Sequence, residues 1–381
     1  MQKSKYTFTA VAFFVWLIVL LVIIFLSTKV LPLQENFLGG GLTNYLKNPY
    51  FWAFGNYDGE HYVSIARLGY GFGEHAFFPL YPILIKLMGN IFGSNLVSFN
   101  LSGIIISLAA FFIGLIGFYK LLLLDFSKKV SKFSVLALLV FPTSFYFGAI
   151  YTESLFFALA VWALFMARQK KWLVASILAM LLTATRFVGI IIIPVILVEW
   201  LMTVWKNKDW LKKLPWSMMI TPLGLFSYMY FLLRKVGDQI AFFNTMSSFG
   251  EQRSSHLILL PQVFYRYVFK ILPNLTTTFW PIIFTTYFEF MIGLIFLIVI
   301  LFAFKKLRLS YWLFLVFGYL IPTFSGSFSS LPRYVLVLFP LYILAGLLAD
   351  KSKKIFFAIE IISFILLVVS FSLFARGYWL S

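Results

Sequence analysis

Long apolar runs, separated by short polar and basic segments, dominate this chain. The run from Tyr6 to Thr28 contains no charged residue. An α-helix rises about 1.5 Å per residue, so a run of this length can cross the roughly 30 Å hydrocarbon core of a bilayer. Similar runs recur along the chain. The pattern therefore predicts an all-α membrane protein, a polytopic bundle of helices.

Short basic clusters lie between the apolar runs and predict how the chain threads the membrane. They fall at Lys3 and Lys5, and at 120–132, 168–171, 206–213, 305–308 and 351–354. Basic loops tend to stay on the cytoplasmic side, so we place all of these clusters inside. Neighbouring clusters must then be joined by an even number of crossings. This parity predicts about eleven transmembrane helices, with the N-terminus inside and the C-terminus outside.

The same parity places three turns on the outer side, and each turn carries one ionisable residue. These residues are Glu153, Arg186 and Arg333. Arg186 lies at the junction of two short predicted spans, 172–186 and 187–205.

Two long outer loops, 28–96 and 234–275, complete the predicted outer face. The second carries Asp238, Glu251 and Arg253. In the first, the segment 76–95 is apolar, but a crossing there would place the 120–132 cluster outside. We therefore expect the segment 76–95 to form a re-entrant or interfacial helix that prolines separate from the rest of the loop. We also expect short interfacial helices within the first loop.

Composition agrees with a membrane protein and excludes several other classes. The chain is 62% hydrophobic and only 12% charged, whereas soluble domains carry about 25% charge. Its net charge of +18 is dispersed between apolar runs, so we expect no nucleic-acid partner. It has no cysteine, hence no disulfide and no thiolate metal site. We find no internal repeat and treat residues 1–381 as one domain.

Candidate chemistry is concentrated in the first outer loop. Three of the chain's thirteen acidic residues and two of its three histidines fall between positions 58 and 75. They are Asp58, Glu60, His61, Glu74 and His75. A carboxylate there suits proton abstraction from a hydroxyl group. An arginine near the outer leaflet suits a lipid-linked phosphate, which a guanidinium can grip with two hydrogen bonds.

Several segments together resemble a known family. Residues 56–82 read NYDGEHYVSIARLGYGFGEHAFFPLYP, and the likeness continues through YTESLFFAL (151–159), TRFVG (185–189), GDQIAFFNTMSSFGEQR (237–253) and LPRYVLVLFPL (331–341). In this order they resemble the mannosyltransferase that adds the second mannose of the GPI anchor, and its prokaryotic relatives. These proteins belong to the C-type glycosyltransferase (GT-C) superfamily. Tyr57 stands where the family usually has tryptophan, a change that we expect to leave the aspartate undisturbed.

The resemblance implies an activity and a site. A hexose, mannose by the likeness, would pass with inversion from a polyprenyl-phosphate donor to a hydroxyl of a lipid-linked or surface glycan acceptor. This would occur on the outer, extracytoplasmic or lumenal face of the cell membrane, without a cofactor. Asp58 would be the catalytic base, and Glu74 would assist it or position the acceptor. From topology we assign Arg186 and Arg333 to the donor phosphate. Further candidate substrate contacts are Glu60, His61, His75, Glu153 and Tyr334.

Each assignment has a simpler alternative. Asp58 could cap a helix beginning at about Glu60. Glu74 could be an ordinary loop acid or a partner for Arg67. The two histidines of the loop could bind a metal with the nearby acids, although no HExxH-type spacing is present and we expect no metal.

Other functions also remain open. A polyprenyl-linked sugar flippase or another transporter would have similar hydropathy, but it should show related halves with charges near mid-membrane. A non-catalytic assembly partner is a further alternative. The chain instead collects polar residues toward one face, which favours the transferase.

Overall fold

A computed structural model describes residues 3–35, 39–205, 214–245 and 256–380, and every regular element in these ranges is a helix. The first half contains α1 (Lys3–Val30), α2 (Leu42–Lys47), α3 (Pro49–Trp52), η1 (Ala53–Gly55), α4 (Asp58–Leu68), η2 (Glu74–Ala76), α5 (Leu80–Ile91), α6 (Leu96–Leu122), α7 (Lys128–Val140), η3 (Ser144–Phe147), α8 (Glu153–Arg168), α9 (Trp172–Thr183), η4 (Phe187–Ile191) and α10 (Ile192–Val204).

The second half contains η6 (Trp216–Ile220), α11 (Leu223–Val236), α12 (Ala241–Asn244), α13 (Leu260–Arg266), η8 (Tyr267–Ile271), α14 (Trp280–Ala303), α15 (Leu309–Thr323), α16 (Leu331–Leu336), α17 (Pro340–Lys351) and α18 (Lys353–Ala375). The basic cluster 206–213, and Glu251 and Arg253 of the second predicted outer loop, lie outside the described residues.

Six helical segments in the described ranges are long and apolar enough to cross a membrane. They are Thr7–Val30, Leu96–Leu122, Phe187–Val204, Trp216–Val236, Trp280–Ala303 and Lys353–Ala375. The protein is therefore an integral membrane protein, as predicted, but the count of about eleven spans is not confirmed. The other expected crossings fall on α7, α8, α9, α15 and α17, which have 12 to 16 residues. Helices of that length extend about 18–24 Å, less than the hydrocarbon thickness.

The chain turns at the places that parity predicted. Helices end at Val140, Thr183 and Thr323, and the connection after each leads to one of the three ionisable residues of the predicted outer turns. Within 76–95 the structure has the separate short helix α5, which begins directly after Pro79. Pro82 lies in its first turn, where a missing N–H disturbs no intrahelical hydrogen bond.

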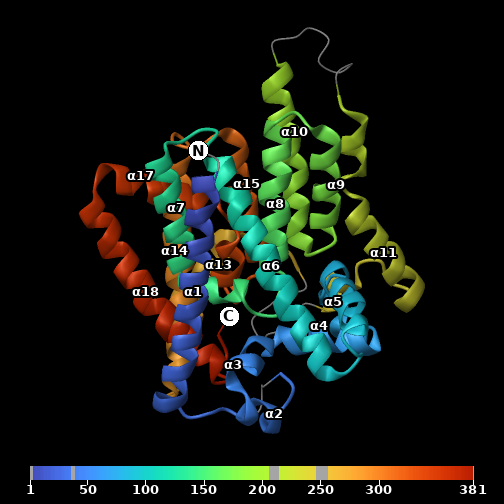
Figure 1. Ribbon diagram of the computed structural model, residues 1–381, viewed down its shortest axis with the longest axis vertical. Helices are drawn as coiled ribbons and strands as arrows, with labels where there is room; N and C mark the ends of the chain where they lie inside the picture. Colours follow the sequence, from blue (N-terminus) through green and yellow to red (C-terminus); the bar gives the residue numbers. More distant parts are fainter. Residues whose placement is uncertain (1–2, 36–38, 206–213, 246–255, 381) are drawn as a thin grey trace.

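Helices α2 to α5 gather at one end of the molecule, away from the N-terminus, and we call this the loop end (Figure 1). Helix α8 packs against α6, α9 and α10. Close contact between α6 and α8 depends on glycines. A Cβ atom at Gly114 would lie 2.7 Å from the Phe157 ring, and one at Gly117 would lie 2.6 Å from the Trp162 indole. Small residues allow membrane helices to approach this closely.

A network of ion pairs joins the long helices at the ends that face away from the loop end. Arg168 donates two hydrogen bonds, of 2.5 and 2.7 Å, to the carboxylate of Asp125. Arg308 donates two more, of 2.6 and 2.8 Å, to Glu199. Arg168 also lies 3.9 Å from Glu199, which joins the two pairs. Arginines from two of the basic clusters that we placed inside, and Asp125 from within the 120–132 segment, therefore meet in one network, in agreement with their sharing a side.

Candidate functional site

Four charged side chains from four of the family-like segments meet in one cluster, the Asp58 cluster. Its members are Asp58, Glu153, Arg186 and Arg333. Asp58 is the first residue of α4, and Arg333 lies in the short helix α16. Arg333 donates from Nη1 to Oδ2 of Asp58 at 2.5 Å across 275 positions of sequence. The fold thus brings together all three ionisable residues of the predicted turns and the proposed base.

Glu153 binds both arginines of the cluster. It begins α8, and its side chain is 1% exposed. Its Oε1 atom accepts a hydrogen bond from Nη1 of Arg186 and lies 3.3 Å from Nε of Arg333. A carboxylate this deeply buried would be costly without such partners. Glu153 therefore holds the two guanidinium groups beside each other, rather than standing exposed to a substrate.

Aromatic rings surround the two guanidinium groups. Arg186 lies over the ring of Tyr334 at 4.5 Å, while Arg333 lies 5.2 Å from the ring of Tyr151 and 5.7 Å from that of Tyr146. Cations interact favourably with aromatic faces at these distances. Burial opposes the charge of Arg333, but Asp58 and Glu153 outweigh it and raise the arginine pKa well above its usual range. Both side chains therefore keep the permanent charge of a guanidinium group.

Asp58 does not cap the helix on which it lies. Helix α4 starts at Asp58 itself, two residues earlier than expected, and no side chain caps it. The backbone N–H of Asp58 donates to the Tyr151 hydroxyl at 3.2 Å, and that hydroxyl donates to the Asn56 carbonyl at 3.1 Å. The carboxylate is 21% exposed and pairs with Arg333. The capping alternative is therefore wrong, because the Asp58 side chain is directed into the cluster.

Glu74 forms a second, separate contact group. Its Oε2 accepts a hydrogen bond from the Gly71 N–H at 2.8 Å, and its Oε1 lies 3.3 Å from Nδ1 of His61. His61 lies three residues after Asp58 on α4, so both share one face of this helix. Glu74 thus contacts His61, which lies on the same helix face as Asp58. The alternative partner considered for Glu74, Arg67, is exposed.

The remaining sequence candidates are more scattered. Glu60 is exposed, and His75 is buried with its ring parallel to that of Tyr70. The His75 carbonyl accepts a hydrogen bond from the Tyr228 hydroxyl at 2.8 Å. Tyr334, in contrast, contributes its ring directly beneath Arg186. Within the described ranges, no three His, Asp or Glu side chains come together as metal ligands would.

Sequence reasoning did not nominate Tyr146 and Tyr151. Both are buried, and they form part of the wall against Arg333. Tyr151 is the first residue of the YTES segment, so its position next to Glu153 was an available signal. Tyr146 lies in an apolar, aromatic stretch without any such signal.

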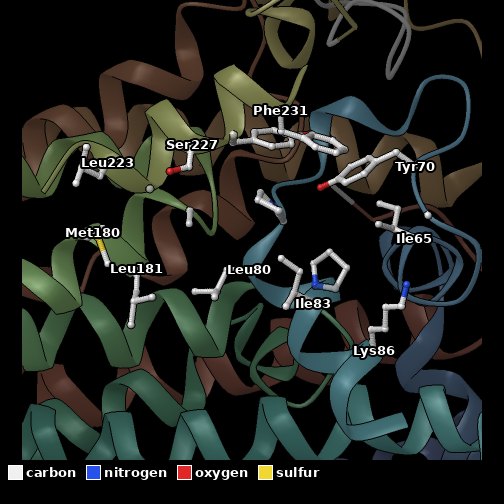
Figure 2. A pocket seen from close by; sticks show the side chains of 16 residues that line it. Ile65, Tyr70, Leu80, Ile83, Lys86, Met180, Leu181, Leu223, Ser227 and Phe231 are labelled. Carbon is white, nitrogen blue, oxygen red and sulfur yellow. The ribbon is translucent and has the colours of Figure 1, made fainter. Parts of the chain in front are cut away.

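An apolar cavity of about 490 Å³ lies between α4 and α5 on one side and α9 and α11 on the other. Figure 2 shows Leu80, Ile83, Leu181 and Phe231 around it, with Lys86 at its edge. The cavity adjoins the segment that carries Arg186, because the Leu80 N–H donates to the carbonyl of Ala184 at 3.1 Å.

Comparison with known proteins finds similar folds among solved structures. No protein-family model matches the sequence, and no curated protein sequence matches it. Among solved structures, the chain is similar to the oligosaccharyltransferase of Archaeoglobus fulgidus, crystallised in complex with zinc and sulfate. The two are 15% identical with a TM-score of 0.48, and the alignment covers 96% of this chain and 53% of the other. The chain thus spans about half the length of that protein.

Proposed function

We propose that this protein is a membrane glycosyltransferase. It transfers a hexose, mannose by the family resemblance, from a polyprenyl-phosphate donor to a hydroxyl group of a lipid-linked or surface glycan, with inversion at the anomeric carbon. The site lies on the extracytoplasmic side of the membrane. The observation that carries this proposal is the Asp58 cluster. Four segments that resemble the family, far apart in sequence, place their charged residues in mutual contact.

The proposed reaction assigns a role to each member of the cluster. The acceptor oxygen attacks the anomeric carbon as the bond to the phosphate oxygen breaks, and polyprenyl phosphate leaves with the bonding electrons. Asp58 takes the proton of the attacking hydroxyl group. Arg333 and Arg186 bind the phosphate oxygens and stabilise the charge that develops there. Glu153 holds these two arginines in place.

The existing ion pairs constrain how the donor can bind. Arg333 already contacts Asp58, and Arg186 already contacts Glu153. Asp58 is 21% exposed whereas Glu153 is 1% exposed, so an arriving phosphate meets the Asp58–Arg333 pair first. We propose that the phosphate shares or replaces that contact, and that the Glu153 contacts persist.

The apolar cavity offers a place for the hydrocarbon chain of a lipid-linked substrate. Its walls combine aliphatic and aromatic side chains from α5, α9 and α11, and α11 is part of a segment apolar enough to cross a membrane. It also adjoins α4, the helix that begins with Asp58. A lipid chain in this cavity would bring its head group toward the Asp58 cluster.

A donor-specific transfer assay tests the proposed function. Purified protein in liposomes should move radiolabelled mannose from polyprenyl-phosphate mannose into an organic-soluble or glycan product. It should not use a nucleotide sugar directly. Transfer from the nucleotide sugar alone, or none from any polyprenyl-phosphate hexose with a range of glycolipid acceptors, would contradict the proposal.

One observation favours the alternative of a lipid-carrier flippase. Ion pairs occur at both ends of α8, with Glu153 at one end and Arg168 at the other. Two such networks could act as gates that open in turn. Fluorescent polyprenyl-phosphate sugar in reconstituted vesicles distinguishes the two. A flippase would make both leaflets accessible to a reducing quencher and leave the sugar on its carrier.

A further inference from the structure

The C-terminal tail, defined as residues 374–380, comprises the end of α18 and the residues that follow it, and it is folded against the candidate site. Ala375 is 0% exposed, Tyr378 4% and Leu380 1%. Backbone carbonyls of this tail accept hydrogen bonds from side chains elsewhere in the protein. The donors are Tyr45 to Ala375 at 2.6 Å, Asn56 to Phe374 at 2.8 Å, Tyr57 to Gly377 at 2.6 Å and Tyr146 to Leu380 at 2.6 Å.

Tyr57 connects this tail to the proposed base. Its hydroxyl donates to the Gly377 carbonyl, and its ring packs against Phe374 at 6.0 Å and Trp379 at 5.2 Å between centroids. The next residue in the chain is Asp58. The tail therefore fixes the Tyr57 side chain one residue before the carboxylate that contacts Arg333.

The backbone of Tyr57 is in an unusual conformation. Its φ is 54° and its ψ is −116°, a combination that a bulky L-residue rarely adopts. Such a conformation persists only where the surroundings hold it. Here Asn56 is also tied to the tail, through its side-chain amide and the Phe374 carbonyl. The turn into α4, and with it the direction of Asp58, depends on contacts with a segment more than three hundred residues later.

We propose that Tyr57 is a positioning residue, whose hydrogen bond to the Gly377 carbonyl holds Asp58 in line with Arg333. This inference rests on the proposed function for its catalytic consequence, but the contact itself can be tested separately. The proposed role of Tyr57 is indirect, because its hydroxyl is bound to the Gly377 carbonyl. It acts through the geometry of the residue that follows it.

Kinetics of three variants test the catalytic consequence. Tyr57→Phe removes only the hydroxyl, and we expect kcat to fall about tenfold with the donor KM changed less than about twofold, because small displacements of a reacting group are costly. Tyr57→Trp supplies an indole N–H and a large ring, and it should restore most of the loss. Tyr45→Phe is the matched control: it removes another 2.6 Å hydroxyl bond to the same tail, away from Asp58, and should retain near wild-type kcat.

Hydrogen exchange measured by mass spectrometry tests the positioning itself. The N–H groups of Asp58, Gly59 and Glu60 donate to Tyr151, Asn56 and Tyr57. Peptides covering these positions should exchange faster in Tyr57→Phe, return toward wild type in Tyr57→Trp, and stay unchanged in Tyr45→Phe.

The two measurements separate the possible failures. A Tyr57→Phe protein with wild-type kcat and wild-type exchange overturns the inference, as does an equal loss of kcat in Tyr45→Phe. If the wild-type protein transfers no sugar, the proposed function fails. Hydrogen exchange then still tests the positioning role of Tyr57. Faster exchange at positions 58–60 that is confined to Tyr57→Phe supports this role, and unchanged exchange in Tyr57→Phe overturns it.

Discussion

The carboxylate of Asp58 and the guanidinium of Arg333 lie 2.5 Å apart, although 275 positions separate them in the chain. Each was nominated from its own segment, one as a base and the other as a phosphate ligand. Because they are in contact, a substitution of either residue removes an ion-pair partner from the other, which remains charged in a partly buried site. Mutations at these two positions should therefore be strongly coupled.

Arg333→Ala should lower transfer from the lipid donor by at least about tenfold, because a buried charged hydrogen bond to the phosphate is lost. Arg333→Lys should recover only part, since lysine keeps the charge but lacks the planar fork. Steady-state kinetics at varied donor concentration measure both. Arg67→Ala, an exposed arginine on α4, serves as the control. Full rescue by lysine would show that charge alone suffices, and wild-type activity of Arg333→Ala would remove this residue from the site.

Glu153→Gln should destabilise the protein as well as reduce its activity. It removes the carboxylate that both arginines share, and breaking a buried pair of this kind costs about 3–5 kcal/mol. Asp350→Asn is a matched control, because the Lys129–Asp350 pair, 2.9 Å apart, is about half exposed on each side. Surface pairs are worth about 0–1 kcal/mol. Thermal unfolding in detergent compares the two variants, and similar melting temperatures would contradict the structural role of Glu153.

Single cysteines should report the topology cleanly, since the chain has no native cysteine. Lys171→Cys and Lys306→Cys, both at exposed positions, should react with an impermeant reagent only from the cytoplasmic side. Phe72→Cys, at the fully exposed tip of the first loop, should react only from outside. Labelling of Phe72→Cys and Lys171→Cys from the same side would refute the predicted separation of the loop end from the basic clusters.

Filling the apolar cavity should weaken use of the lipid donor. Ile83→Trp replaces an aliphatic side chain at the cavity wall by a bulky indole ring. We expect the donor KM to rise several-fold, which corresponds to about 1 kcal/mol of lost binding free energy, with kcat nearly unchanged. Leu87→Trp, one turn further along the same helix and outside the cavity, is the control. A short-chain donor should be less affected than a long one. Equal KM changes in the two variants would argue against a lipid chain in this cavity.

Local pattern and parity were enough to predict an all-helical membrane protein and the positions of its turns. They did not establish how many helices cross the membrane. Parity counts crossings, but several expected spans, such as the twelve-residue α9, are too short to cross by length alone. A helix that is tilted or only partly immersed in the membrane has the same kind of apolar run in its sequence as a helix that crosses it.

Every charged member of the Asp58 cluster could also be predicted as a site residue from the sequence, because charges are scarce among the apolar runs and each of these residues stands in a predicted turn or loop. Which of these residues form ion pairs with one another could not be predicted. Nothing in the local sequence shows that Glu153 would hold both arginines, or that Asp58 would begin its helix instead of capping it. Those contacts depend on how α4, α8 and α16 pack. The docking of the C-terminal tail beneath Tyr57 is likewise a tertiary feature.

The most direct test of the central claim is the rate of sugar transfer by purified Asp58→Asn. Asparagine keeps the size and a hydrogen-bonding oxygen but cannot accept the proton, so we expect normal accumulation in the membrane and a loss of about 10²- to 10⁴-fold in rate. Glu60→Gln, an exposed acid on the same helix, should remain largely active. If Asp58→Asn transfers sugar from the lipid donor at a rate close to wild type, Asp58 is not the base and the proposed mechanism is wrong.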